Sequence, residues 1–413
     1  MNTFTTYGLC KQTRTGYILN PFLYSILYQA TKVNINTTDM NNTRAHHIDY
    51  LKAWAVIVMI EVHVVNCFLN PLLRTVWWFH IVNFINGLVA PVFIFTAGFS
   101  FVYSVMQKRG EPINFSKLLL RRANRILLIF LVGYLIHIPY FSLKNIIIYA
   151  SPAELKSFYS TDVLQCIGSG LLMLLFLRMV IKSDTCYHYI ITSIGLLVVF
   201  VTPYVWNVDF TRWIPLPIAT YFNEMHGSLF PLFPWHGFLF LGASYGIFQL
   251  RNTNNNHAIS SNPFIVISFI MSISGIVIMH YLSKNPAYNI KPSAIFFITR
   301  YALVIVLLHL CQWYLNVKNN QGGLFIVIGK ESLLVYWLHL QILYRHIFNG
   351  KSLEKIVNQK FGIPECFIAF CLLTALMFIV AIIWNTLKQN HPAVSKRIFA
   401  ATIIIGLIKF LLL

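Results

Sequence analysis

Four ionisable side chains interrupt the apolar stretch IDYLKAWAVIVMIEVH at residues 48–63. They are Asp49, Lys52, Glu61 and His63. Ionisable groups within a membrane-spanning helix are costly, and they usually mark a binding site or a proton pathway. An imidazole, with an ordinary pKa of about 6.5, accepts a proton from an attacking group at neutral pH, whereas a lysine ammonium binds phosphate. The stretch therefore favours a site with an anion-binding group at one end and a base at the other.

An α-helix places Lys52 and His63 on one face, because eleven residues correspond to about three turns plus 20°. The same geometry separates them by about 16 Å along the helix. Glu61 points almost opposite to Lys52, so it must face another helix or the far mouth of the site. Because successive residues diverge by about 100°, contact between Glu61 and His63 would need a bridging water or a partner from another helix. Lys52 alone is more typical of a side chain that reaches back to the membrane interface, so only the combination indicates a site.

The composition predicts an all-α polytopic membrane protein. Of the 413 residues, 57% are hydrophobic and only 10% are charged, and the mean hydropathy is +0.66; soluble domains are about 25% charged. A helix needs roughly 20 apolar residues to cross a bilayer, and the sequence offers enough windows for about 10–11 transmembrane helices in one bundle. The predicted spans are residues 50–70, 78–106, 118–141, 163–181, 188–206, 229–249, 263–283, 293–317, 323–349, 362–384 and 397–413.

Residues 1–47 are predicted to be a separate polar segment, and residues 48–413 to be the transmembrane domain. The apolar part of the segment, GYILNPFLYSILYQA, is too short to span a membrane and contains Pro21, so we predict an interfacial helix there. Alternatively, the segment lies upstream of the true start, because the membrane pattern begins just after Met40. It lacks the basic start, apolar core and cleavage site of a signal peptide.

The net charge of +19 arises from 31 basic and 12 acidic residues. We interpret it as a positive-inside bias and attraction to anionic membrane lipids, not as nucleic-acid binding. The densest basic stretch, KRGEPINFSKLLLRRANR at residues 108–125, is predicted to lie in the cytoplasm. This prediction puts the N-terminus in the cytoplasm and His63 towards the opposite leaflet of a plasma or inner membrane. The lysines of the predicted outer loop conflict with the rule: Lys351, Lys355 and Lys360.

Several motifs resemble those of a known family of membrane enzymes. Asp49-Tyr50-Leu51-Lys52, followed by ten residues and His63, is similar to the first-helix signature Asp-x-Leu-(Arg/Lys)-x10-His of the large membrane acyltransferase superfamily. Arg122-Ala123-Asn124-Arg125 is similar to its Arg-x-x-Arg motif. Four segments resemble the heparan-α-glucosaminide N-acetyltransferase-like branch: APVFIFTAGFS (90–100), DVLQCIGSG (162–170), LFPLFPWHGFLFLGASYG (229–246) and ESLLVYWLH (331–339). The resemblance covers roughly residues 45–350.

The resemblance implies an acyltransferase whose donor is cytoplasmic acyl-CoA, usually acetyl-CoA, and whose acceptor is a hydroxyl or amine of a saccharide or glycan on the other side. His63 would be the base, and Glu61, or a carboxylate from another helix, would orient it or stabilise its cation. The phosphates of the donor would bind to four cationic residues: Lys52, Arg121, Arg122 and Arg125. No metal is predicted, since the seven cysteines show no ligand spacing.

The chain departs from the family pattern in two places, and the second departure leaves the identity of the catalytic imidazole open. The usual Arg-Gly is Lys52-Ala53 here, which keeps the charge but not the forked geometry of arginine. The glucosaminide branch has Asn where His63 stands, and its proposed catalytic histidine lies near the start of the second span, where His80 is the nearest match. His63 and His80 are therefore alternative bases.

Other features fit more than one function. A proton-coupled transporter or exporter is the alternative function, although the sequence shows neither the inverted repeats nor the paired broken helices of such proteins. Tyr336 and His339 would share one helix face, either as polar contacts between helices or as part of the site. Gly98 is predicted to permit a close contact between helices.

Overall fold

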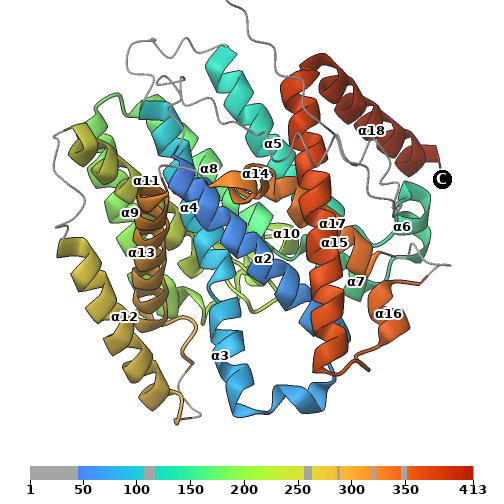
Figure 1. Cartoon of the computed structure of the whole chain (residues 1–413), viewed down its shortest axis with the longest axis horizontal. Coiled ribbons are helices and arrows are strands. Elements are labelled where there is room, and N and C mark those ends of the chain that lie inside the picture. The colour runs from blue at the N-terminus through green and yellow to red at the C-terminus, as the bar shows by residue number, and fades with distance from the viewer. Residues whose placement is uncertain are drawn as a thin grey trace, which may run out of the picture. The chain divides into compact units, whose positions relative to one another are not determined.

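The computed structural model describes residues 45–106, 117–254, 263–285, 289–318, 322–345 and 351–412. The predictions for residues 1–44 and for residues 108–116 of the basic stretch lie outside these residues. In the described part of the chain, the regular structure is helical, apart from single bridge residues at Leu69 and Phe361, which pair with each other, and at Lys351. The longer helices (Figure 1) are α2 (His46–Phe68), α3 (Trp77–Asn86), α4 (Val89–Met106), α5 (Lys117–His137), α8 (Val163–Val180), α9 (Asp184–Val205), α11 (Leu232–Asn254), α12 (Pro263–Leu282), α13 (Ala294–Val317), α15 (Ser332–Tyr344), α17 (Ile363–Asn390) and α18 (Pro392–Leu412). The shorter ones are η1 (Pro71–Arg74), α6 (Leu143–Tyr149), α7 (Pro152–Tyr159), η2 (Phe210–Arg212), α10 (Leu216–Ala219), α14 (Gly323–Lys330) and α16 (Leu353–Val357).

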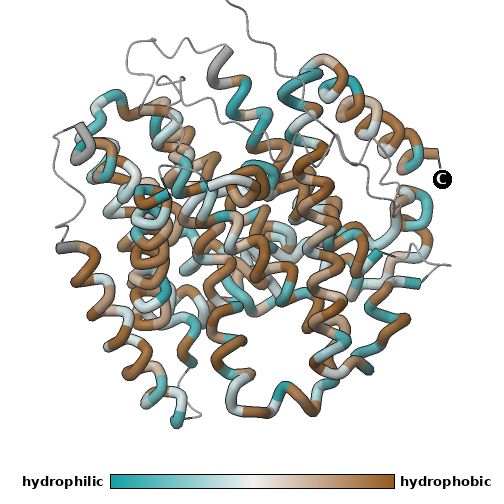
Figure 2. Tube along the Cα trace, in the orientation of Figure 1, coloured by the Kyte–Doolittle hydropathy of each residue, from teal (hydrophilic) through white to brown (hydrophobic). Residues whose placement is uncertain are grey.

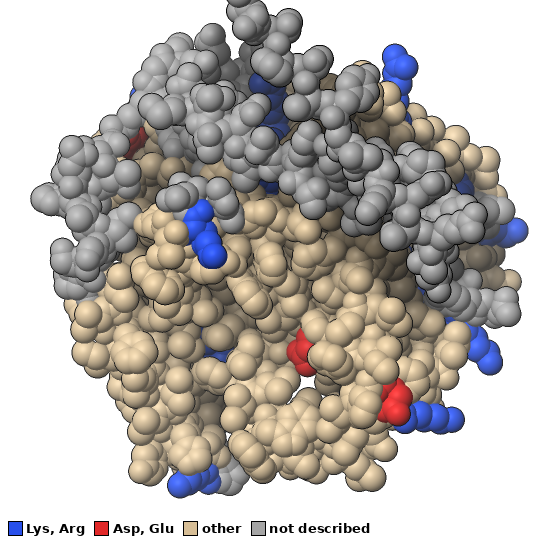
Figure 3. Space-filling model, in the orientation of Figure 1, with Lys and Arg blue, Asp and Glu red and all other residues tan. Residues whose placement is uncertain are grey.

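The predicted class, an all-α polytopic membrane protein, is confirmed. A helix lies in each of the predicted windows. Apolar residues dominate most helices in Figure 2, and the described surface in Figure 3 is mostly uncharged. Among the described helices, seven segments are long and apolar enough to cross a membrane, fewer than the ten to eleven predicted. α5 and α18 each contain at least three cationic residues, which reduces their apolar character.

α14 and α15 form a broken span in place of the single helix predicted at residues 323–349. The two helices differ in direction by 75° and meet at Glu331. Gly329 lets α14 approach α2 closely, because a Cβ there would overlap the Asp49 carbonyl. Glu331 is buried and accepts a hydrogen bond from Lys388 of α17 at 2.6 Å, so a charged pair holds the break. If α14 and α15 are counted together as one membrane span, the described helices form eight spans.

The helix that carries the ionisable stretch, α2, ends under the side chain of Arg74. Arg74 Nη2 lies within 3.2 Å of the carbonyl oxygens of Val65, Asn66 and Leu69. The last carbonyls of a helix have no partner within the helix, and a cation there is favourable. Arg74 therefore fixes the end of α2 close to His63.

Glycine permits backbone contact between α4 and α11. A Cβ on Gly98 of α4 would overlap the Leu239 carbonyl of α11, and a Cβ on Gly242 of α11 would overlap the Phe95 carbonyl of α4. The predicted role of Gly98 is confirmed. Because both helices also line the cavity described below, their spacing affects the candidate site.

Replacing Gly98 with alanine should lower the midpoint of thermal unfolding. The added methyl group meets a backbone carbonyl that cannot rotate away, and overpacking of this kind costs about 1–3 kcal/mol. Unfolding of the full-length protein in detergent, followed by tryptophan fluorescence, measures the effect. Gly406→Ala in α18 is the matched control, because its new methyl group would lie 3.8 Å from the nearest atom of another element. Equal midpoints for the two variants would contradict this description of the α4–α11 contact.

Candidate active site

A cavity of about 860 Å³ lies where the ends of several helices meet. It is lined by the C-terminal half of α2, by α3, by the starts of α4, α8, α11 and α13, and by the ends of α5 and α15. The connection between α9 and α11 contributes Trp206, Glu224 and Phe230. A cavity of this size accommodates a small-molecule ligand. The described residues include no group of three or more His, Cys, Asp or Glu side chains that could hold a metal ion.

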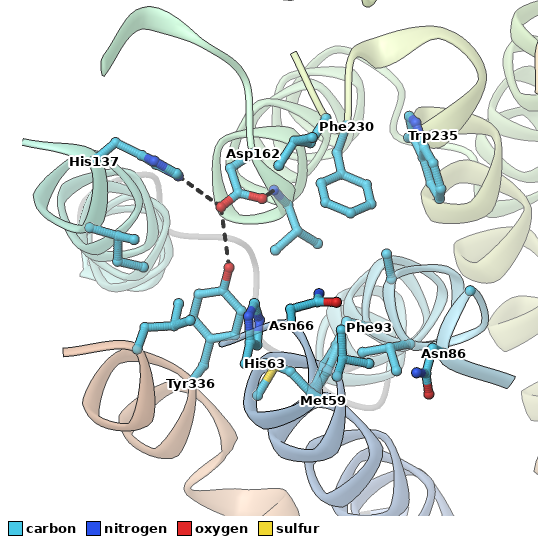
Figure 4. Close-up of a pocket in the computed structure, with 18 of the residues that line it drawn as sticks. Met59, His63, Asn66, Asn86, Phe93, His137, Asp162, Phe230, Trp235 and Tyr336 are labelled. Atoms are coloured by element: carbon cyan, nitrogen blue, oxygen red, sulfur yellow. Dashed lines mark hydrogen bonds and ion pairs between the residues drawn. The ribbon is translucent and has the colours of Figure 1, made fainter. Parts of the chain in front are cut away.

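Asp162 is the hydrogen-bonding centre of the cavity wall (Figure 4). Its Oδ2 lies 2.8 Å from His137 Nε2 at the end of α5 and accepts the Tyr336 hydroxyl of α15 at 3.4 Å. Its Oδ1 accepts the backbone N–H of Val163 at 2.7 Å, so the same side chain caps the start of α8. One carboxylate therefore links α5, α8 and α15.

The surroundings of Asp162 keep it ionised at neutral pH. Its side chain is only 13% exposed, and burial by itself raises the pKa of a carboxyl group. The hydrogen bond and charge of His137, together with the N–H of Val163, outweigh burial, so the pKa of Asp162 lies below its ordinary value. The cavity therefore contains a fixed negative charge, which acts on both His137 and His63.

His63 lines the cavity next to two residues of α15. Its Nδ1 lies 3.2 Å from the Tyr344 hydroxyl, and its ring centre lies 5.2 Å from that of His339. His339 is buried, and its Nδ1 donates to the Val335 carbonyl at 2.7 Å, which leaves Nε2 as an acceptor. Among the described residues, nothing bonds to that Nε2. Of the two residues predicted to share one face of α15, Tyr336 lines the cavity, whereas His339 contacts the His63 ring but is not a lining residue.

Glu61 and His80 do not line the cavity. Glu61 contacts Asn86 of α3, and no hydrogen bond joins it to His63 in the described part of the chain. This agrees with helix geometry, because residues two positions apart do not face each other. His80 is exposed on α3. Of the two alternative bases, His63 is the one that borders this cavity.

The four cationic residues predicted to bind the donor are also absent from the cavity lining. Lys52 Nζ donates to Ser100 Oγ at 3.1 Å, and Arg122 Nη2 donates to the Ser104 carbonyl at 3.1 Å, so α4 holds both cations one turn apart. The other two are exposed on α5: Arg121 and Arg125. In Figure 1, the start of α5 lies at the top of the view, whereas α3, which lines the cavity, lies at the bottom. The structure therefore separates the cations from His63.

Sequence reasoning missed Asp162, His137 and Tyr344 as residues of the site. Asp162 opens the DVLQCIGSG motif, and an aspartate directly before an apolar run is a common helix cap, so a signal for its position existed. His137 lies near the end of a predicted span. Nothing in the sequence indicates that it meets a carboxylate 25 residues later.

The helices and the cavity define a polytopic membrane protein with a site lined by histidine and carboxylate side chains. Residues 44–286 match the family described as heparan-alpha-glucosaminide N-acetyltransferase, catalytic. Because the match covers more than half of the chain, the protein belongs to this family, and its function is of the transmembrane acetyltransferase type. The matched range includes His63, His137 and Asp162, whereas α13 and α15 lie beyond it. No curated protein matches the chain.

Replacing Asp162 with asparagine should destabilise the protein at pH 7 by about 1–3 kcal/mol, because a charged, buried hydrogen-bond acceptor is lost. Since the folded-state pKa lies below the ordinary value of 3.8, the ionised carboxylate stabilises the folded state above that value, and this stabilisation disappears as the pH falls through the folded pKa. The difference in unfolding midpoint between wild type and Asp162→Asn should therefore shrink between pH 7 and pH 3.

Thermal unfolding in detergent at several pH values measures this difference. Glu365→Gln serves as the control, because it neutralises an exposed carboxylate at the start of α17. A difference for Asp162→Asn that stays constant from pH 7 to pH 3 would contradict the description of Asp162 as an ionised, stabilising group.

Proposed function

We propose that the protein transfers an acetyl group from cytoplasmic acetyl-CoA, or another acyl-CoA, to a hydroxyl or amine of a saccharide or glycan on the opposite side of the membrane. The observation that supports this most is the position of His63, which borders a cavity that also contains the ionised Asp162. Because the chain belongs to an acetyltransferase family, we assign acetyl transfer to this group of side chains. The cavity would hold the acceptor.

In this proposal His63 is the base. Its Nδ1–H would donate to the Tyr344 hydroxyl, which lies 3.2 Å away, so that Nε2 is free to take the proton of the acceptor. The acceptor oxygen or nitrogen attacks the thioester carbonyl, the bond between carbon and sulfur breaks, and the CoA thiolate leaves and takes up a proton. The fixed charge of Asp162 would stabilise the imidazolium that forms, as the carboxylate of a catalytic triad does. Direct transfer and a transient acyl-histidine remain alternative forms of this step.

The donor would approach from the basic end of the helices. Arg125 lies one turn from both Arg121 and Arg122 near the start of α5, and Lys52 lies on α2; these cations suit the phosphates of CoA. The excess of cations at this end also favours a cytoplasmic location under the positive-inside rule. The acyl group would then extend from the cations to His63, parallel to α2. Lys52 and His63 are about 16 Å apart along this helix.

A proton-coupled transporter, which also uses buried carboxylates and imidazoles, is the alternative function, and the broken span α14–α15 is consistent with it. Transporters built from inverted repeats have such breaks in both halves, whereas this is the one bent pair of this kind among the described helices. Turnover of acetyl-CoA by detergent-solubilised protein, where no gradient exists, separates the two functions.

Replacing His63 with alanine should reduce the turnover of acetyl-CoA by about 100- to 10,000-fold, the usual effect of losing a general base. Acetyl-CoA binding should change by less than about twofold, since the cations lie elsewhere. Release of the CoA thiol in detergent, with and without glucosamine as a trial acceptor, measures turnover. His280→Ala on the exposed face of α12 is the control. If His80→Ala abolishes turnover while His63→Ala does not, the base is His80 and the assignment of His63 is wrong.

Replacing Arg122 and Arg125 together with alanine should have the reverse effect. Each lost charge-assisted bond to phosphate weakens binding by about 1.5–3 kcal/mol, so the dissociation constant of acetyl-CoA should rise more than about tenfold. At saturating acetyl-CoA, the rate should fall far less. Arg397→Ala in α18, another exposed cation, controls for the change in net charge. Unchanged affinity in the double variant would rule out this end of α5 as the donor site.

A further inference from the structure

Arg300 of α13 is a cation in the wall of the cavity that the mechanism above does not use. Its guanidinium lies over the Phe296 ring, 3.8 Å from the ring centre, and 5.6 Å from the ring centre of Phe84. Its side chain is partly buried and borders the cavity. A guanidinium held against aromatic rings keeps its in-plane N–H groups available for a ligand.

The hydrogen bonds of Arg300 do not satisfy its five N–H donors. Nε donates to the Gly87 carbonyl at 3.3 Å, and Nη1 has only a distant sulfur contact, 3.9 Å from Met279 Sδ. Among the described residues, no carboxylate lies within 4.0 Å of the guanidinium. Partly burying a cation without a counter-charge is unfavourable, so these donors are available to an anionic ligand.

The two other cations of the cavity are held by hydrogen bonds to neighbouring residues, although only Lys291 bonds to a carboxylate. Lys291 Nζ lies 3.2 Å from Glu224 Oε2. Arg345 donates to the carbonyls of Leu135 and Ile138 at the end of α5 and to the Gln341 side chain. Both therefore have structural partners, and Arg300 differs from them.

Amide side chains surround the same place. Asn83 and Asn86 line the cavity one turn apart on α3, directly before Gly87, whose carbonyl Arg300 binds. A Cβ on Gly87 would stand 3.1 Å from Arg300 Nη2, so the glycine leaves room for the guanidinium. Figure 4 shows Asn86 across the cavity from His137 and Asp162. The cation and the amides thus lie away from the Asp162 end of the cavity.

We propose that Arg300, with Asn83 and Asn86, binds an oxyanion (a carboxylate, sulfate or phosphate) that the acceptor carries away from its reacting group. This rests on the proposed function, which makes the cavity the acceptor site. The planar guanidinium binds two oxygens of such a group at once. Asn83, and the N–H of Asn86 that is not directed at Glu61, add further donors. The phosphates of the donor share this chemistry. They belong to the opposite, basic end of the helices in the proposed function, so the acceptor is the source of the anion.

Equilibrium binding of matched sugars to the purified full-length protein in detergent, without acetyl-CoA, tests the proposal. The pairs are glucosamine with glucosamine 6-phosphate, and glucose with glucuronate. In the wild type, at least one anionic sugar should bind about tenfold or more tightly than its neutral partner. Arg300→Gln should reduce this ratio to within about twofold and leave neutral-sugar and acetyl-CoA binding unchanged. Arg397→Gln, which removes an exposed cation from α18, should keep the wild-type ratio.

Three results would overturn the proposal: no preference for either anionic sugar in the wild type, an undiminished preference in Arg300→Gln, or an equal loss of acetyl-CoA affinity, which would assign the anion to the donor. If Arg300→Gln does not fold, Arg300→Lys decides, because it keeps the charge without the fork and should lower the ratio at least about threefold. A wild type that prefers anionic sugars but never turns over acetyl-CoA would reject the enzymatic function and retain the anion site.

Discussion

The buried carboxylate of Asp162 is the constraint on which the rest of the cavity depends. It binds one side chain from α5 and one from α15 and caps α8. The preceding residue, Thr161, extends this control to the connection between α9 and α11: its N–H donates to Ser228 Oγ at 3.0 Å, and its hydroxyl donates to the Thr220 carbonyl at 3.1 Å. A single turn of chain therefore fixes three helices and the connection that contributes to the cavity lining.

The separation of charges along α2 follows from one uninterrupted helix. Lys52 is held by α4 near its start, whereas His63 borders the cavity near its end. Between them, Val56 and Met59 are buried in the apolar core. Under the proposed function, this layout keeps a phosphate-rich donor away from the acceptor, so that only the acyl group needs to approach His63. The close glycine contact between α4 and α11 holds two walls of the same cavity together.

Much of the fold could be predicted because apolar windows and helix periodicity are local properties of the sequence. A site at His63 could be predicted because an imidazole within an apolar helix is costly unless it faces a polar environment. The break between α14 and α15 could not be predicted from apolarity, since apolar residues continue on both sides of it. Lys330 and Glu331 were the signal there, but the partner of Glu331 is Lys388, 57 residues later. The pair of His137 and Asp162 was missed for the same reason, because only tertiary packing brings them together.

The central claim is that the acyl group of a donor bound at the basic end reaches His63 in the cavity. An experimental structure with S-acetonyl-CoA, a donor analogue that cannot transfer its acyl group, tests it most directly. We predict that the ketone carbonyl lies beside His63, where an acceptor hydroxyl or amine could attack it. The phosphates of the analogue should lie at Arg122 and Arg125. A ketone remote from His63, or phosphates inside the cavity at Arg300, would contradict it.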